Sequence, residues 1–374
     1  MTTTNYDPST LEELRETVRA TGDRAIATVG SGANLGLGNA AEREDIVLNT
    51  RGLNRIVDYV PEDQVVVVEA GITLGELQTE LGKHGQRLAI ESLGGDGCTI
   101  GGMLATNAYG ASALRYGTLK DLIVGVELVR ADGVVARAGG KVVKNVAGFD
   151  ISKLIVGSLG TLAIITKATF RVHPVPESAR RLAFRAKIDD VFPFVLALRE
   201  AQLEPSSVAV RLDGAADAEA TIEVLFEGFG PGVDAQSAAC ENIAKRMSLL
   251  PSEVRATNVA GGARSYRLKS TFPPSEFARV ARAIGAEALA FPSLGVIYFD
   301  TGAPDETDAV RVSNLRELFE SLGGTLVVQD MPEEWRGRID AWGTPPPSFK
   351  LMHALKDRFD PRRRLNPGRF VGGL

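Results

Sequence analysis

The chain of 374 residues has few cysteines and histidines, which limits the redox and metal chemistry that we expect of it. Its two cysteines, Cys98 and Cys240, make neither a disulfide framework nor a Cys-x-x-Cys pair. Its three histidines, His84, His173 and His353, are scattered and leave no HExxH or similar cluster. We therefore expect no structural disulfide and no metal site.

The sequence also lacks a secretory leader, a membrane-spanning run and a basic patch. The opening "MTTTNYDPSTLEELRE" has no basic end or apolar core of a signal peptide, and no eighteen-residue apolar span follows. The net charge is −5 with both signs interspersed, and the longest run of one sign is Arg362–Arg364. We expect no nucleic-acid partner and a cytoplasmic protein, with any association with the membrane made through partners.

The composition and the order of elements predict an α+β fold with more than one domain. Hydrophobic residues make up 44% of the chain and charged residues 24%, as in globular proteins, and the length suggests two or three domains. Short strands and helices fill the first half up to "HPVPES", a linker that begins at His173. Longer strands and helices then predict an antiparallel sheet covered by helices on one face, and a Pro-rich break precedes an amphipathic tail.

A glycine loop, "GSGANLGLG" at Gly30–Gly38, follows a short predicted strand. Gly36–Ala41 fits the pattern G-x-G-x-x-A, but the charged, strand-like "EREDIVLNT" follows instead of the helix that a Rossmann site requires. Such a loop still holds phosphate when its backbone N–H groups converge on an anion. A plain turn between two strands is the commoner use, so the loop alone is weak evidence for a ligand.

A second segment, Gly97–Leu114, carries no charged side chain and four glycines. Small and neutral side chains let the backbone approach a flat, anionic, partly apolar ligand, which long charged side chains would block. A tightly packed turn and short helix needs the same residue types. The residues alone leave these two interpretations open.

A third segment, Gly139–Pro176, resembles the end of the FAD domain in the vanillyl-alcohol oxidase / p-cresol methylhydroxylase (PCMH) superfamily, also called FAD-linked oxidase type 4. That family has a glycine loop, a T-x-G-G-x-x-A-T-x-x-x-G segment and a G-S-x-G-T-L strand. Here they match, in this order, Gly30–Gly36, Thr99–Gly110 and Gly157–Leu162. The tail "DRFDPRRRLNPGRF" resembles the family's F-D-P-x-x-x-x-N-P-G. Within the superfamily the chain is similar to the FAD-binding E-type subunit of bacterial glycolate oxidase.

The resemblance implies an architecture and a cofactor. Residues 1–176 would form a two-part PCMH-type FAD-binding domain with subdomains of about 1–90 and 91–176. Residues 177–345 would form an α+β cap, and residues 346–374 would pack back on the FAD domain. FAD would be bound non-covalently, because the first loop lacks a linking histidine and Cys98 lies one residue from the position of a cysteinyl-flavin bond in some relatives. The implied FAD-binding positions are Gly30, Ser31, Gly32, Ala33, Asn34, Leu35, Thr99, Gly101, Gly102, Thr106, Asn107, Gly110, Arg115, Tyr116, Gly117, Asp121, Gly160, Ile164, Ile165 and Asn366.

The implied activity is hydride transfer from a 2-hydroxy acid, such as glycolate or D-lactate, to flavin, in a complex with a second flavoprotein subunit and an iron–sulfur subunit. Catalytic relatives usually carry G-S-E-G-T-L and a cap motif H-x-G-D-G-N. Here Leu159 replaces the glutamate, and residues 176–345 contain no such motif. A non-catalytic FAD-binding partner subunit, or a stand-alone oxidase of an alditol or a sugar lactone, therefore stays open.

Catalytic groups are harder to assign, because oxidation of a 2-hydroxy acid needs a base for the hydroxyl proton and a cation for the carboxylate. The tail supplies three candidates, His353, Lys350 and Arg369, if it returns to the flavin. The alternative is that His353 and Lys350 are solvated residues on a helix surface and have no catalytic role.

Overall fold

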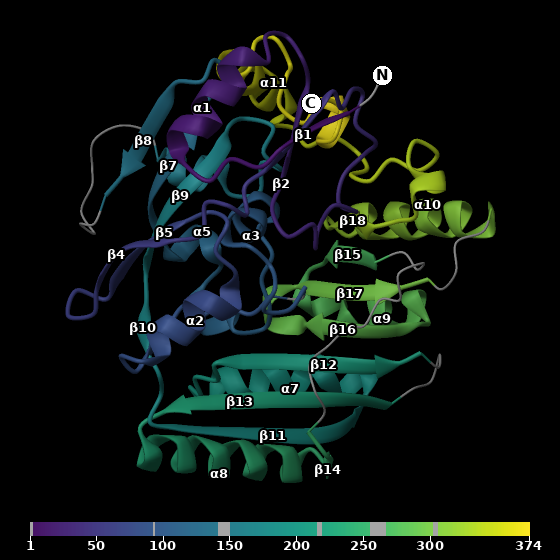
Figure 1. Cartoon of the computed structure of the whole chain (residues 1–374). Helices are drawn as coiled ribbons and strands as arrows, with labels where there is room; N and C mark the ends of the chain where they lie inside the picture. The colour runs from purple at the N-terminus through teal and green to yellow at the C-terminus, as the bar shows by residue number, and fades with distance from the viewer. Residues whose placement is uncertain (1–2, 93, 141–149, 215–218, 255–266, 302–305) are drawn as a thin grey trace. The chain divides into compact units, whose positions relative to one another are not determined.

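The computed structural model describes residues 3–92, 94–140, 150–214, 219–254, 267–301 and 306–374 (Figure 1). The segment "KVVKNVAGF" at 141–149, part of the family resemblance, lies outside the described residues. The chain divides into two compact units. Unit 1 comprises residues 1–110, 117–175 and 340–374, and unit 2 comprises residues 111–116 and 176–339. Among the described residues, no helix combines the length and apolar character needed to cross a membrane.

Unit 1 contains two main sheets. The first is parallel, in the order β1-β3-β2, with α1 packed on it. The second is antiparallel, in the order β4-β5-β9-β7-β8. The elements are β1 (Thr4–Tyr6), α1 (Leu11–Ala20), β2 (Ile26–Val29), β3 (Ile46–Asn49), β4 (Ile56–Val60), β5 (Val65–Glu69), β7 (Ile123–Val129), β8 (Val135–Gly139) and β9 (Ile164–Arg171).

Sequence signals account for much of this unit. Asp132-Gly133, a dipeptide typical of hairpin turns, joins β7 to β8, and Gly133 has the positive φ of 75° that the turn requires. Because β5 pairs with β9, the second sheet takes strands from both sides of residue 90. The predicted boundary between subdomains at about residue 90 therefore does not separate the two sheets.

Short helices connect these strands. Thr73 begins α2 with a capping box: its hydroxyl accepts from the Glu76 backbone N–H, and the Glu76 carboxylate accepts from the Thr73 N–H. The remaining elements of unit 1 are α2 (Leu74–Gly82), β6 (Gln86–Arg87), α3 (Ile100–Thr106), α5 (Leu119–Leu122), α6 (Ile151–Ile155), β10 (His173–Pro174), α11 (Phe349–Phe359) and η4 (Val371–Gly373).

The C-terminal segment is tied to unit 1 through its backbone and through a buried arginine. Leu365 forms a parallel bridge with Ile26, whose N–H donates to the Arg364 carbonyl over 2.7 Å. The Arg364 guanidinium is buried and donates to the carbonyls of Val18 and Ala131. The third arginine of the "RRR" run is therefore a structural residue.

Unit 2 is built on one antiparallel sheet, in the order β14-β11-β13-β12-β16-β17-β15-β18. Figure 1 shows α7 and α9 behind its strands. The α+β class and the antiparallel second sheet are confirmed. The elements are α4 (Ala113–Tyr116), β11 (Ser178–Lys187), α7 (Ile188–Glu200), β12 (Ser207–Asp213), β13 (Glu219–Gly228), α8 (Gly230–Arg246), β14 (Leu250–Pro251), β15 (Arg267–Thr271), η1 (Pro274–Glu276), α9 (Phe277–Ile284), β16 (Glu287–Phe291), η2 (Pro292–Leu294), β17 (Val296–Asp300), α10 (Glu306–Ser321), β18 (Thr325–Asp330) and η3 (Glu333–Trp335).

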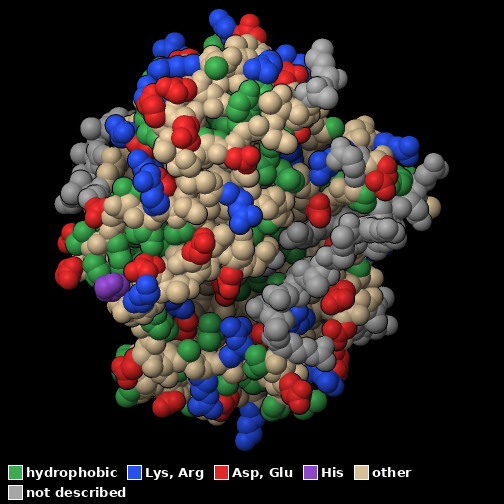
Figure 2. Space-filling model, in the orientation of Figure 1, with side chains coloured by type: hydrophobic (Ala, Val, Ile, Leu, Met, Phe, Trp, Pro, Cys, Tyr) green, Lys and Arg blue, Asp and Glu red, His purple; other side chains and the backbone are tan. Residues whose placement is uncertain are grey.

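Alternation along the central strands gives this sheet two different faces. On β12, Val208, Val210 and Leu212 are buried on one face, while Arg211 belongs to the other. The apolar face packs against helices, and the other face carries charged side chains. On the side of the molecule drawn in Figure 2, acidic and basic side chains are interspersed without a large patch of either sign.

Candidate functional site

Two narrow cavities in unit 1, of about 70 and 50 Å³, share several lining residues. The shared residues are Thr28, Gly30, Gly102, Ala105, Leu159 and Asn366. We refer to the two together as the glycine-lined cavity. Its other lining residues are Val29, Ser31, Gly32, Ala33, Asn34, Leu35, Thr50, Gly101, Thr106, Gly160, Ala163, Ile164, Ile165 and Arg369.

One wall of the cavity is a face of α3 that carries only small side chains. Ile100, Met103 and Leu104 are buried in the core of unit 1. Gly102 and Ala105 instead lie against the cavity. The helix thus turns its large apolar side chains to the core and its small ones to the cavity, so backbone is exposed to whatever binds there.

The opposite wall is the first glycine loop, which is fixed to α3 by reciprocal hydrogen bonds. The Ser31 N–H donates to the Thr99 hydroxyl over 3.4 Å, and the Thr99 N–H donates to the Ser31 hydroxyl over 3.3 Å. A Cβ on Gly30 would lie 2.1 Å from the Thr99 Oγ1, so only glycine fits this approach. Thr99 is buried and positions the loop, although it is not itself a lining residue.

The polar groups of the cavity suit an anionic ligand. Among the described residues, no acidic side chain lines it, whereas the Arg369 guanidinium does and donates to the carbonyls of Leu35 and Leu37. The Thr28 hydroxyl is buried without a partner among the described residues, and an unmade hydrogen bond of this kind costs free energy. Gly32 has a φ of 80°, a backbone conformation that glycine adopts readily. This conformation lets successive backbone N–H groups converge on an anion.

Many positions predicted from the family motifs line this cavity. They are Gly30, Ser31, Gly32, Ala33, Asn34, Leu35, Gly101, Gly102, Thr106, Gly160, Ile164, Ile165 and Asn366. The structure therefore brings together segments as far apart in the chain as Gly30 and Asn366.

Other predicted positions are not among the lining residues and have local contacts instead. Asn107 ends α3 in the left-handed conformation. A Cβ on Gly110 would meet the Glu91 carboxylate. Gly117, at φ of 78°, packs on Asp121, whose carboxylate accepts from the Thr118 N–H and hydroxyl in a capping box.

Arg115 and Tyr116 also lie away from the cavity lining, in α4 of unit 2. Both contact Glu227 on β13: the Arg115 Nη1 donates to its carbonyl over 3.0 Å, and the Tyr116 hydroxyl donates to its carboxylate over 3.1 Å. These contacts attach the short segment 111–116 to the sheet of unit 2.

The lining also includes residues that were not among the predicted FAD-binding positions: Thr28, Val29, Thr50, Ala105, Leu159 and Ala163. Ala105 is the alanine of the T-x-G-G-x-x-A-T motif and follows Gly101 by four residues, so the motif and the helical periodicity both point to it. Leu159 has φ of 51°, and its carbonyl accepts from the Asn366 amide over 2.6 Å. Nothing in its local sequence indicates this contact, because Asn366 comes from the tail.

The three tail candidates for catalysis have different places. Arg369 lines the glycine-lined cavity. His353 is exposed on α11, where its Nδ1 lies 2.9 Å from the Asp357 carboxylate and its Nε2 lies 2.8 Å from Arg363. Lys350 is exposed on the same helix. Neither His353 nor Lys350 is among the residues that line the glycine-lined cavity.

A polar cluster that the motifs missed lies on the charged face of the unit 2 sheet. Lys269 on β15 is directly opposite Tyr298 on β17, with its Nζ 5.6 Å from the ring centroid. Burial lowers the pKa of the Lys269 ammonium to about 8. Farther along the same face, Glu223 accepts from Arg181, and Arg211 lies 3.6 Å from its carboxylate.

Comparisons with known proteins agree with this geometry. A family described as "FAD binding domain" matches residues 6–139. The D-lactate dehydrogenase of Archaeoglobus fulgidus is 28% identical over 98% of this chain and 91% of its own length. Glycolate oxidase subunit GlcD of Bacillus subtilis is 26% identical over 97% and 87%. Among solved structures, alkyldihydroxyacetonephosphate synthase shares the fold, with a TM-score of 0.74 and 18% identity over 97% of this chain and 75% of that one. The comparisons confirm the resemblance to the FAD-linked oxidase superfamily, and the cofactor is FAD.

Proposed function

We propose that this protein is an FAD-dependent oxidoreductase that takes a hydride from a small 2-hydroxy acid such as glycolate or D-lactate. The observation that carries the proposal is the glycine-lined cavity, whose walls expose backbone and small side chains in a chain of an FAD-binding family. The similar proteins are a D-lactate dehydrogenase and a subunit of glycolate oxidase, and both names refer to 2-hydroxy acids. They support this class of substrate.

The residues of the cavity fit FAD, and we assign parts of the cofactor to them. The loop Gly30–Leu35 and the Arg369 guanidinium would hold the diphosphate, because they offer backbone N–H groups and a positive charge. The small face of α3 and the backbone of Ile164 and Ile165 would lie along the rest. Bound FAD would supply the hydride acceptor.

Binding would be non-covalent. Within the part of the chain that the structure describes, no histidine, cysteine or tyrosine, the side chains that usually link a flavin, lines the glycine-lined cavity. Cys98 is buried at 1% exposure in the core of unit 1 and packs with apolar neighbours as an ordinary thiol does.

We further propose that electrons leave through partners, a second flavoprotein subunit and an iron–sulfur subunit, in a cytoplasmic assembly. Leu159 occupies the position at which catalytic relatives usually carry a glutamate, and it lines the cavity. One of the similar proteins is itself a subunit of glycolate oxidase. Both points favour a chain that acts within a complex.

Anaerobic reduction of the flavin tests the function. We expect the purified protein to be yellow and its flavin absorbance near 450 nm, about where oxidised flavins absorb, to bleach when glycolate or D-lactate is added. Bleaching that needs an added partner subunit would assign the chain the role of a non-catalytic FAD-binding subunit. A protein that takes up no FAD would contradict the proposal, and bleaching by an alditol instead of a 2-hydroxy acid would contradict the substrate class.

A further inference from the structure

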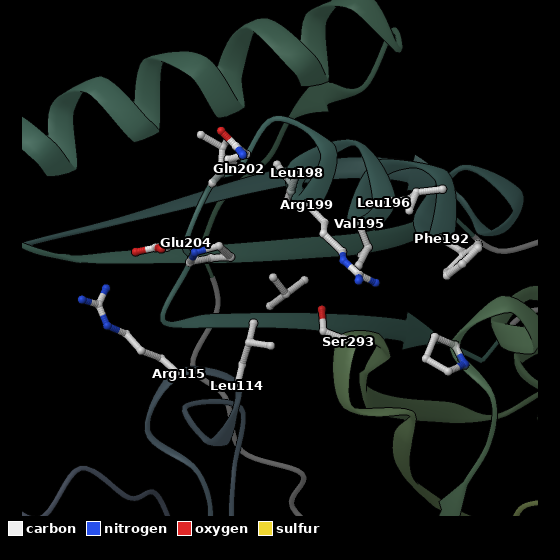
Figure 3. A pocket seen from close by; sticks show the side chains of 14 residues that line it. Leu114, Arg115, Phe192, Val195, Leu196, Leu198, Arg199, Gln202, Glu204 and Ser293 are labelled. Carbon is white, nitrogen blue, oxygen red and sulfur yellow. The ribbon is translucent and has the colours of Figure 1, made fainter.

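A separate cavity of about 650 Å³ lies wholly within unit 2, on the helix-covered side of its sheet (Figure 3). Val208 of β12, whose side chain belongs to the apolar face, lines it together with α7 and α4. The glycine-lined cavity, to which the proposed function assigns FAD, is lined by residues of unit 1. A ligand bound in the cavity of unit 2 would therefore not depend on the proposed function.

Helix α7 has two apolar faces, and only one of them is used for packing in the core. Ile188, Val191, Phe194 and Leu198 are buried, at the spacing of one helix face. Phe192, Val195, Leu196 and Arg199 form a second face, which lines the cavity. Leu196 remains 39% exposed. A surface helix normally turns polar residues to this second face, so three apolar side chains followed by an arginine indicate an apolar ligand with a charged end.

Two polar groups enter the cavity from opposite walls. In Figure 3, the Arg199 side chain extends from α7 into the space above β12, and the Ser293 hydroxyl points into the same space from below. Neither side chain has a hydrogen-bond or ion-pair partner within the part of the chain that the structure describes. A guanidinium and a hydroxyl on facing walls can both donate hydrogen bonds to the oxygens of a carboxylate.

The remaining charged groups of the lining are opposite in sign. Arg115 and Glu204 point to the same side of the view in Figure 3, away from the Arg199 guanidinium. Arg115 also donates to the Glu227 carbonyl. The charges of Arg115 and Glu204 offset each other, so the positive charge of Arg199 is the excess that a ligand meets.

We propose that this cavity binds a small carboxylic acid with an apolar tail, its carboxylate between Arg199 and Ser293 and its tail against Phe192, Val195 and Leu196. The volume is within the range of small-molecule sites, which are mostly apolar with a few polar groups that orient the ligand. A cationic ligand would be repelled by Arg199, and a sugar would leave its hydroxyls unpaired against the apolar wall.

Octanoate is the probe, and calorimetric titration of the FAD-loaded protein is the measurement. We expect octanoate to bind with a Kd of about 1 mM or tighter. Two analogues measure the contributions of the carboxylate and the tail separately: acetate keeps only the carboxylate, and 1-octanol keeps the tail without it. Both are expected to bind at least about tenfold more weakly. Equal affinity for 1-octanol, or no octanoate binding at about 10 mM, would overturn the proposal.

Paired variants locate the site. Arg199→Gln is expected to weaken octanoate binding about tenfold and to leave 1-octanol unchanged. Arg246→Gln is the matched control, because it removes the same charge from the last turn of α8 and should change neither. Leu196→Glu, at an exposed position, is expected to abolish octanoate binding because the new carboxylate repels the ligand. Leu196→Lys is expected to keep octanoate binding. Equal effects of Arg199→Gln and Arg246→Gln, or of the two Leu196 variants, would overturn the assignment. Melting temperatures close to that of the wild type verify that each variant is folded.

Discussion

Replacing Ala105 with leucine is expected to remove FAD from the protein while leaving it folded. Ala105 lines both parts of the glycine-lined cavity, which are about 70 and 50 Å³, so the added carbons occupy space that the cofactor needs. Leucine is a good helix former and suits α3. Overpacking of this kind costs about 1–3 kcal/mol, which corresponds to roughly a 5- to 150-fold loss of affinity.

The measurement is the flavin content after purification, followed by the Kd for FAD from quenching of flavin fluorescence. Ala105→Ser keeps the side chain small and is expected to bind FAD within about threefold of wild type. Ala354→Leu makes the same exchange on the exposed surface of α11 and should leave FAD binding unchanged. Full flavin occupancy in Ala105→Leu would show that FAD does not pass beside α3.

The two walls of this cavity are local features of the sequence, although only the family resemblance favoured a ligand site over tightly packed turns. The loop from Gly30 is rich in glycines and small residues, and the second segment from Gly97 lacks charged side chains. Both features allow the backbone to approach a ligand closely. Each property depends on neighbouring residues within one segment. The antiparallel sheet of unit 2 was also predictable, since it follows from alternation and the order of elements.

Contacts between distant segments were not predictable in the same way. Asn366 meets Leu159 only because the tail bridges to β2, and no periodicity in either segment specifies that pairing. Arg115 and Tyr116 follow the small-residue segment directly, yet they contact Glu227, more than a hundred residues away. The low pKa of Lys269 has the same origin, since burial depends on the tertiary structure around β15.

The Lys356→Met variant is expected to be the most destabilising single change in the tail. The Lys356 ammonium is 1% exposed and donates to the carboxylate of Asp360 and to the carbonyls of Thr161 and Leu365, over 2.8 to 2.9 Å. Methionine fills a similar volume but leaves the Asp360 charge buried and unpaired. Breaking a buried ion pair on one side costs about 3–5 kcal/mol, a large share of the stability of an ordinary domain.

Trp342 reports this loss, because its indole N–H donates to the Arg369 carbonyl and its ring packs on Phe370 in the same tail. In a Trp335→Phe background it is the single tryptophan, so its fluorescence follows denaturation of unit 1 without a signal from unit 2. Lys350→Met is the control, since Lys350 is exposed on the same helix and its loss should cost no more than about 0.5 kcal/mol.

A double variant separates the charge from the packing. If the buried Asp360 carboxylate is the cause, Lys356→Met combined with Asp360→Asn should be more stable than Lys356→Met alone, because the amide carries no charge and its oxygen still accepts from the Leu365 N–H. If the cause is the three lost donor hydrogen bonds, the double variant should be no more stable than the single one. A loss below about 1 kcal/mol in Lys356→Met itself would show that the tail is held by its backbone bridge to β2 and by Arg364 rather than by this ion pair.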